Sequence, residues 1–310
     1  MEEAPMTAVL GGRRRFSRPA RMWPLVTSAP PTAAPVSETV SIVSTSLTVL
    51  AVVVAWFLAQ LMLLGGIEQG RAQDRLYDQF REQLAAATAP VGGIIAPGAP
   101  VAVMSIPSLG WEQVVTEGTS AGTLLNGPGH RRDTVLPGQA GVSLVYGRSS
   151  TFGRPFAPIL SSGAGAKMTV VTGQGTATYT LGSVRRAGDP MPPAPSGTAS
   201  RITLVTSDGS SALSPGDVVY IDATSTGDTF VAPPGRLNAI APSETAMAAD
   251  RSVMPALALS LGALALVTVG VLVARRRFGM ARTWLVGAPI VVALAWMSAD
   301  LTTYLLPNLL

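Results

Sequence analysis

The chain has no cysteine, one histidine (His130) and one lysine (Lys167) among its 310 residues. The absence of cysteine excludes disulfides, thiolate nucleophiles and thiolate metal ligands. One histidine cannot supply a histidine-rich metal site, so we expect no metal and no cofactor. Any domain outside the cytoplasm must therefore be stabilised by a packed core.

Charge is also scarce, because only 13% of the residues are charged while 47% are hydrophobic. This balance places part of the chain in lipid. A helix crosses a bilayer with about 20 apolar residues, and three segments are that long: residues 40–65, 254–274 and 284–306. The third contains Pro289 and Asp300, so the alternative is two spans followed by a shorter hydrophobic tail. Asp300 is a candidate functional residue, since carboxylates within membranes are costly.

Arginines gather in two places, within residues 1–39 and in the connection 275–283. Cytoplasmic flanks of membrane helices collect Lys and Arg. We therefore predict a multi-pass protein of the cell membrane with a cytoplasmic N-terminus, a disordered basic tail over 1–39 and a cytoplasmic basic loop over 275–283. The motif "RRRFSR" also resembles a twin-arginine export signal, but the apolar segment begins too far downstream. Because the positive charge lies outside the folded domain, we expect no nucleic-acid partner.

Residues 66–92 repeat apolar side chains every four positions at Leu76, Phe80 and Leu84. This spacing predicts an amphipathic helical stalk that ends before Pro90. The stalk is either solvated or packed against the domain, a partner helix or the membrane surface.

Residues 95–225 consist of short β-like runs separated by Gly, Pro, Ser and Thr. "GQG" at 173–175 lies between two alternating runs and predicts a hairpin. Strands at this spacing, with no long amphipathic helix among them, predict an all-β barrel or sandwich outside the cytoplasm. Residues 226–253 are predicted to be a flexible linker that returns to the membrane.

Several motifs of residues 101–223 are similar to those of the sortase family, most closely the class E type of actinobacteria. They are "SIPSLG" (105–110), "VTEGTS" (115–120), "GPGH" (127–130), "TVLPGQAG" (134–141), "TFGRPF" (151–156) and "TLVTS" (203–207). The resemblance implies a closed eight-stranded β-barrel in the cell envelope. It also implies transpeptidation, in which a cysteine attacks a sorting-signal peptide and passes the acyl group to an amine.

Three positions depart from the family pattern that the resemblance implies. Arg148 stands where the family has its catalytic histidine, Ser207 replaces the cysteine, and Asp217 or Gly216 falls near the position of the oxyanion-stabilising arginine. A serine needs an adjacent base, and a guanidinium cannot accept a proton. We therefore expect a degenerate sortase, a pseudoenzyme without transpeptidase activity.

The remodelled groove suggests a binding or scaffolding module for a surface peptide, a wall polymer or a partner protein. Candidate groove residues are His130, Arg148, Thr206, Ser207 and Asp217, and an Arg148–Asp217 ion pair would close the former site. Under the alternative, Ser207 acts as the nucleophile of an acyl transferase or hydrolase, with His130, Asp208 or Lys167 to activate it.

Two further sets of residues suggest contacts with other molecules. Arg131, Arg132, Arg185 and Arg186 could form a basic patch for anionic wall polymers or lipid headgroups, unless they are ordinary solvated charges. Gly262 and Gly270 give the second membrane segment small residues for close helix contact. In a third hypothesis the spans bind a membrane protein partner and the barrel stabilises that larger assembly.

Overall fold

A computed structural model of the chain describes residues 47, 51, 54–209, 214 and 216–310. The predicted basic tail and residues 40–46, 48–50 and 52–53 of the first predicted membrane segment lie outside the described residues. The chain separates into two units, Met1–Val49 and Leu50–Leu310, and the second is described below. Residues 54–59 are helical and continue into a π-helical turn, η1 (Gln60–Leu64).

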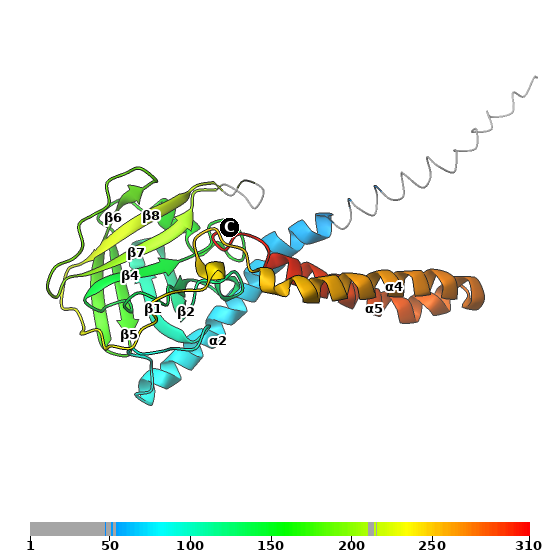
Figure 1. Ribbon diagram of the computed structural model, residues 1–310, viewed down its shortest axis with the longest axis horizontal. Helices are drawn as coiled ribbons and strands as arrows, with labels where there is room; N and C mark the ends of the chain where they lie inside the picture. The colour runs from blue at the N-terminus through cyan, green and yellow to red at the C-terminus, as the bar shows by residue number, and fades with distance from the viewer. Residues whose placement is uncertain (1–46, 48–50, 52–53, 210–213, 215) are drawn as a thin grey trace, which may run out of the picture. The chain divides into compact units, whose positions relative to one another are not determined.

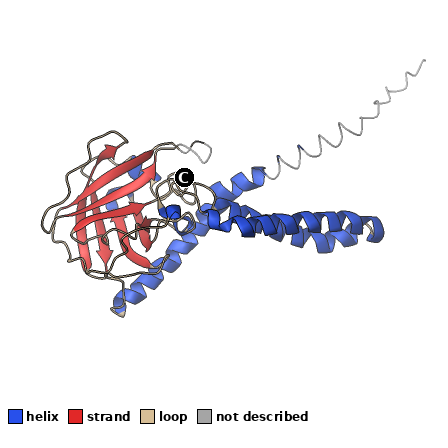
Figure 2. Ribbon diagram, in the orientation of Figure 1, coloured by secondary structure: helices blue, strands red, loops and turns tan. Residues whose placement is uncertain are grey.

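Eight strands close into one barrel in the order β1-β2-β3-β4-β7-β8-β6-β5 (Figures 1 and 2). Their bounds are β1 (Pro100–Ile106), β2 (Trp111–Glu117), β3 (Gly129–His130), β4 (Gly141–Tyr146), β5 (Lys167–Thr172), β6 (Gly175–Arg185), β7 (Ser200–Ser207) and β8 (Val218–Ser225). The predicted eight-stranded barrel is confirmed. The hairpin predicted at "GQG" is also confirmed, because β5 and β6 pair antiparallel up to Thr172 and Gly175.

The barrel core is apolar and fills the interior with side chains from every long strand. It includes Val101, Met104, Ile106, Val145, Met168, Val170, Leu181, Ile202, Leu204 and Ile221. Each buried aliphatic side chain of this size stabilises the fold by about 1.5–3 kcal/mol relative to an exposed one. Tyr179 is fully buried, and its hydroxyl accepts from the Gly138 amide (3.0 Å) and contacts Ser200 Oγ (2.8 Å). The largest apolar cluster of this cysteine-free chain therefore lies inside the barrel.

Helix α2 (Gly65–Ala85) packs against the barrel. Phe80 is fully buried against Val103 of β1 and Val114 of β2. The Gln73 side chain accepts from the Val114 amide (2.7 Å) and donates to the carbonyl of Asn126 (2.8 Å). The periodicity correctly predicted a helix, and of the alternatives left open for the stalk the structure shows packing on the domain. The helix ends at Ala85, before Pro90.

The segment 226–253, predicted as a flexible linker, instead packs on the barrel. Phe230 joins the edge of the main core, and its backbone bonds to Gly138 (2.9 Å) and Ala140 (2.8 Å). Farther along, Arg236 and Glu244 bond to barrel residues. Phe230, Arg236 and Glu244 thus hold this segment against the barrel, although its Gly and Pro content is typical of a flexible linker.

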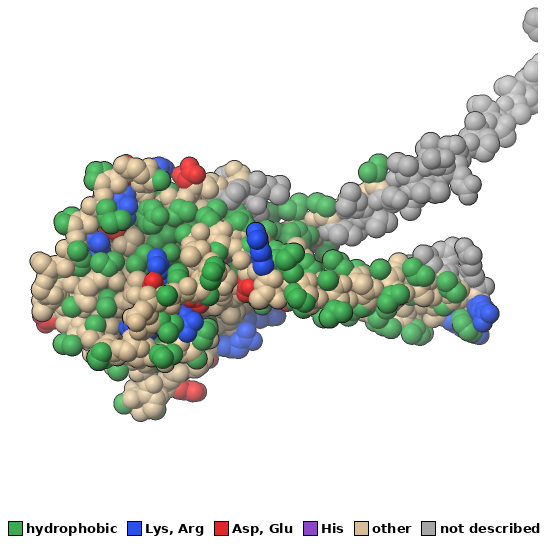
Figure 3. Space-filling model, in the orientation of Figure 1, with side chains coloured by type: hydrophobic (Ala, Val, Ile, Leu, Met, Phe, Trp, Pro, Cys, Tyr) green, Lys and Arg blue, Asp and Glu red, His purple; other side chains and the backbone are tan. Residues whose placement is uncertain are grey.

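Helices α4 (Met254–Phe278) and α5 (Met280–Thr303) lie side by side as a hairpin joined at Gly279 (Figure 1). Both are long and apolar enough to cross a membrane, over Arg251–Val271 and Leu285–Thr303. Hydrophobic side chains cover the visible face of the pair (Figure 3). The segment 275–283, predicted as a loop, is instead helical apart from Gly279, at which the two helices are joined.

The two helices contact each other through small and polar side chains. Ser298 Oγ donates to Ser260 Oγ (3.1 Å), and Gly287 lies against Val271. At Gly262 and Gly270 no atom apart from chain neighbours and the backbone of the same helix lies within 4 Å of the place where a Cβ would stand. The predicted close helix contact at these two glycines is therefore not made within the described chain.

Candidate functional site

The candidate site, called the groove below, consists of Arg148, Ser149, Thr151, Thr206 and Ser207. These residues lie where the parallel strands β4 and β7 end together. Tyr146 pairs with Val205, and beyond them the Gly147 amide donates to the Val205 carbonyl (3.0 Å). Thr206 Oγ1 donates to the Gly147 carbonyl (2.8 Å). Because carboxyl ends of parallel strands meet at the same edge, the residues that follow β4 come next to the end of β7.

Ser207 is fully buried at the end of β7. Its hydroxyl lies 2.7 Å from Ser149 Oγ and donates to the carbonyl oxygen of Leu309 (3.1 Å). The residues considered as bases bond elsewhere: Lys167 Nζ donates to Thr180, His130 bonds to Glu117, and Asp208 Oδ1 accepts from the Asp217 amide. In the described part of the chain, no hydrogen bond links Ser207 to any of the three.

Arg148 follows β4 and is also fully buried. Its guanidinium donates to Thr151 Oγ1 (3.1 Å), to the Ala121 carbonyl (3.1 Å) and to the Leu310 carbonyl (3.4 Å). The Phe152 ring centroid lies 5.3 Å from the guanidinium carbon, within cation–π range. Burial lowers the pKa of Arg148 to about 9, so the side chain remains charged at neutral pH. Its Nε has no hydrogen-bond partner among the described residues.

The predicted Arg148–Asp217 ion pair is not formed. Arg148 is enclosed by the groove, whereas Asp217 is exposed before β8. Asp217 is more stable in water than it would be in a buried pair with Arg148, because the desolvation cost of a buried ion pair often exceeds its Coulombic gain.

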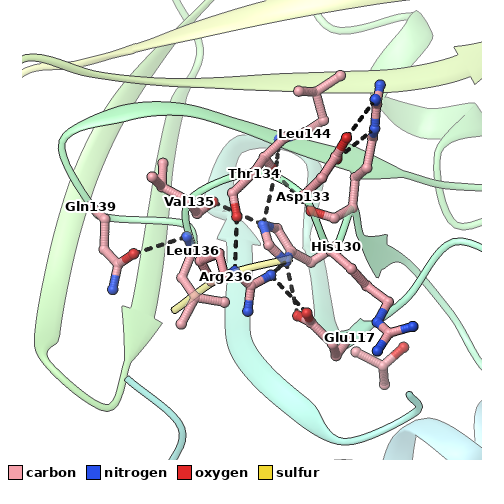
Figure 4. Close-up of polar contacts among 12 residues, drawn as sticks. Glu117, His130, Asp133, Thr134, Val135, Leu136, Gln139, Leu144 and Arg236 are labelled. Atoms are coloured by element: carbon pink, nitrogen blue, oxygen red, sulfur yellow. Dashed lines mark hydrogen bonds and ion pairs between the residues drawn. The ribbon is translucent and has the colours of Figure 1, made fainter. Parts of the chain in front are cut away.

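His130 belongs to a second buried cluster on β2 and β3 rather than to the groove (Figure 4). Its Nδ1 lies 2.9 Å from Glu117 Oε2, and its Nε2 lies 2.8 Å from the Val135 carbonyl. Arg236, from the docked segment 226–253, donates to Glu117 Oε1 (2.7 Å). In this cluster the buried Glu117 carboxylate contacts both His130 and Arg236. The His130 ring bonds to Glu117 and Val135 and does not contact Ser207.

The four arginines of the predicted basic patch each have a carboxylate partner. The pairs are Arg131–Asp133 (2.8 Å), Arg132–Glu244 (3.6 Å), Arg185–Asp222 (2.9 Å) and Arg186–Asp208 (3.4 Å). Local pairing reduces the positive field that an anionic polymer would need.

Sequence reasoning missed the residues that fill the groove, which come from residues 304–310, called the tail below. The Leu309 carbonyl accepts from the Ser149 amide (3.1 Å) and the Ser149 hydroxyl (3.4 Å), in addition to Ser207. Thr151 Oγ1 donates to the Leu310 carbonyl. The hydroxyl run "RSST" after β4 was the available signal. The tail sequence offered no such signal, because its apolar residues are those expected at the end of a membrane helix.

The loop after β4 has a constrained backbone. Phe152 and Arg154 have φ values of 48° and 52°, a left-handed conformation that costs non-glycine residues of order 1–3 kcal/mol each. A Cβ on Gly147 would stand 2.5 Å from the Phe156 ring. In this conformation the loop directs Arg148, Ser149 and Thr151 toward the tail.

A family model described as "Sortase domain" matches residues 104–224. The barrel is a sortase domain. The match spans β2, β3, β4, β5, β6 and β7 with nearly all of β8, and it includes Arg148, Ser207 and Asp217. The fold and the resemblance predicted from sequence are confirmed.

Solved structures of sortases also match the chain. A sortase D5 transpeptidase from Clostridium perfringens is 20% identical, with a TM-score of 0.42, over 51% of this chain and 99% of that one. Sortase E from Streptomyces avermitilis is 25% identical, with a TM-score of 0.35, over 43% of this chain and 91% of that one. Both scores lie below 0.5, so the assignment rests on the domain match. No curated protein matches the chain.

Proposed function

We propose that this sortase domain is a peptide-binding module of the cell envelope without transpeptidase activity. The observation that carries the proposal is the environment of Ser207. Its hydroxyl donates to a peptide carbonyl and contacts a second hydroxyl, and in the described chain no general base lies within hydrogen-bond distance. The ligand class is a surface peptide, a wall-linked peptide or a peptide segment of a partner protein.

The chemistry of the groove favours binding over bond cleavage. A serine hydroxyl becomes a nucleophile only when a neighbouring base takes its proton, and Arg148 has no acceptor. The absence of a general base alone typically reduces the rate 10²–10⁴-fold. The same donors bind a peptide main chain well, because carbonyl oxygens accept from amides and hydroxyls in a site closed to water.

A serine-dependent hydrolase or transferase is the second candidate, since a peptide carbonyl oxygen lies 3.1 Å from Ser207 Oγ. A fluorophosphonate probe separates the two. The full chain in mild detergent is treated with the probe beside Ser207→Ala. Leu309→Lys is included as well, since the tail covers Ser207 in the unmodified chain. Binding without catalysis predicts no labelling in any of the three. Labelling of Leu309→Lys that disappears when Ser207→Ala is added would instead establish the enzyme.

For the membrane we propose that the barrel lies outside the cytoplasm and that α4 and α5 form a two-span hairpin. Two observations support this. The Asp250 amide donates to the Tyr304 carbonyl (2.9 Å), so the two ends of the hairpin meet beside the barrel. The arginines of 275–283 lie at the opposite end, which the positive-inside rule assigns to the cytoplasm.

The cysteine-free chain makes this topology simple to test. Asp228→Cys lies on the barrel side and Phe278→Cys at the far end of α4, and both positions are exposed. In intact cells a membrane-impermeant maleimide should label Asp228→Cys alone, and Phe278→Cys should react only after permeabilisation. Labelling of Phe278→Cys in intact cells would contradict the orientation.

A further inference from the structure

The tail leaves α5 at Tyr304 and enters the groove at Asn308. Asn308 and Leu309 are fully buried, and Leu310 is nearly so. Leu309 packs into an apolar cluster with Leu124, Tyr146 and Val205. The tail is therefore bound in the groove by buried side chains, as a ligand would be.

Asn308 fixes the tail where it enters the groove. Its side-chain amide donates to the carbonyls of Thr119 (2.7 Å) and Thr245 (2.9 Å), and its backbone amide donates to the Ala248 carbonyl (2.9 Å). These contacts join the tail both to the barrel and to the docked segment 226–253.

The tail main chain takes the donors that define the groove. The Leu309 carbonyl faces the hydroxyls of Ser207 and Ser149, and the Leu310 carbonyl faces Thr151 and Arg148. A peptide carbonyl thus stands at the residue that occupies the nucleophile position of the family.

The tail also completes the enclosure of a charge. The Arg148 guanidinium donates to the main-chain oxygens of Ala121 and Leu310 and to the Thr151 hydroxyl. One of these three acceptors belongs to the tail. When the tail leaves, a buried cation loses one acceptor and becomes open to a new ligand.

We propose that the tail is an intramolecular pseudosubstrate, so that an external peptide enters the groove only after the tail has left. This inference deepens the proposed function and rests on it. The chemistry of the tail defines the ligand class: an apolar peptide with a leucine that fills the pocket of Leu124, Tyr146 and Val205. The carbonyl of that leucine accepts from Ser207 and Ser149.

The first experiment measures hydrogen exchange at the Ser149 amide in the full chain in detergent. The tail protects this amide, because it donates to the Leu309 carbonyl. Leu309→Lys should raise its exchange on the order of 30-fold or more, since a buried leucine is removed. Leu305→Lys is the matched control, because Leu305 is half-buried and belongs to none of the core clusters. Equal exchange in both variants and the unmodified chain would overturn the inference.

The second experiment measures binding of a fluorescent peptide with the sequence of residues 304–310. The full chain should not bind it, whereas Leu309→Lys and a chain that ends at Thr303 should. A peptide carrying lysine in place of Leu309 should bind at least about tenfold more weakly. The Leu309→Lys chain retains every groove residue, so it gives a readout even if the shorter chain does not fold.

The outcomes separate the two proposals. Equal binding of the peptide by the full chain and the tail variants would refute the pseudosubstrate and leave the groove a peptide-binding site. Cleavage or transfer of the peptide by Leu309→Lys would refute the non-catalytic function and leave the tail as an occupant of the groove. No binding by any variant would refute both.

Discussion

Removal of the charge of Glu117 should lower the free energy of unfolding of the barrel severely, because it leaves the largely buried Arg236 without its carboxylate partner. Glu117 has a side chain that is 1% exposed and lies 2.7 Å from Arg236, whose side chain is 11% exposed. Glu117→Gln preserves the shape of the side chain and removes its charge. The guanidinium is then left with the carbonyls of Thr134 (3.0 Å) and Gly93 (3.3 Å), beside His130.

The magnitude follows from the burial of the pair. Breaking a buried ion pair from one side typically costs 3–5 kcal/mol, because the other charge stays behind. Arg236 keeps two carbonyl partners and some exposure, so we expect the lower end, about 3 kcal/mol. This corresponds to roughly a 150-fold larger unfolded population. Arg236→Met added to Glu117→Gln removes the unpaired buried charge. The double variant should therefore lose at least about 1.5 kcal/mol less unfolding free energy than the sum of the losses of the two single variants.

Hydrogen exchange of the β7 amides in the full chain measures this free energy, because central strands exchange only on global opening. The three variants and the unmodified chain form a double-mutant cycle. A loss below about 1 kcal/mol for Glu117→Gln, or losses that add within about 0.5 kcal/mol, would refute the reasoning. The segment 226–253 would then be held to the barrel by its apolar contacts.

Three other substitutions test the core and the groove. Tyr179→Phe should cost about 1–3 kcal/mol at neutral pH, since it leaves the Gly138 amide without its acceptor. Burial raises the pKa of Tyr179, so the hydroxyl stabilises the fold fully below about pH 10, and this contribution declines at higher pH because the unfolded chain ionises first. Urea titrations should therefore find that the difference in unfolding free energy between the unmodified chain and Tyr179→Phe decreases above about pH 10. A difference that does not change with pH would contradict this. Gly129→Ala places a Cβ against the Gly118 carbonyl and should cost about 3 kcal/mol, whereas Gly163→Ala, with no atom within 4 Å, should stay within about 0.5 kcal/mol; equal thermal shifts would argue against the close approach. Ser207→Ala should weaken tail docking by about 0.5–1.5 kcal/mol, seen as faster exchange at Ser149, and an unchanged rate would mean that the hydroxyl does not hold the tail.

The sequence predicted the barrel well because strand periodicity and turn residues are local signals. The runs around Val101, Trp111 and Ile202 became strands, and the hairpin at 173–175 formed as expected. Arg148 was expected to point into the groove because its register follows directly from β4, and it is buried against Ala121, Thr151 and Leu310. Its partner was not predictable in the same way, since exposure of Asp217 depends on how the loop before β8 folds.

Long-range docking was beyond sequence reasoning. Phe230 and Arg236 lie in a stretch rich in Gly and Pro, and nothing local distinguishes a docked segment from a flexible one. The tail posed the same difficulty, because its leucines fit a membrane helix and a protein pocket equally well. His130 was a candidate groove residue, whereas its partner Glu117 could be identified only once β2 and β3 were paired.

The groove is assembled from parts that are far apart along the chain. Leu310 lies 162 positions beyond Arg148, and Asn308 lies 189 positions beyond Thr119. Contacts of such high separation are slow to form, because chain entropy must be lost before they form. The barrel strands precede α4, α5 and the tail in the sequence, so the residues that close the site are synthesised after the barrel and both helices. In the proposed topology, a chain stalled before α4 and α5 are inserted would leave Ser207 and Arg148 uncovered.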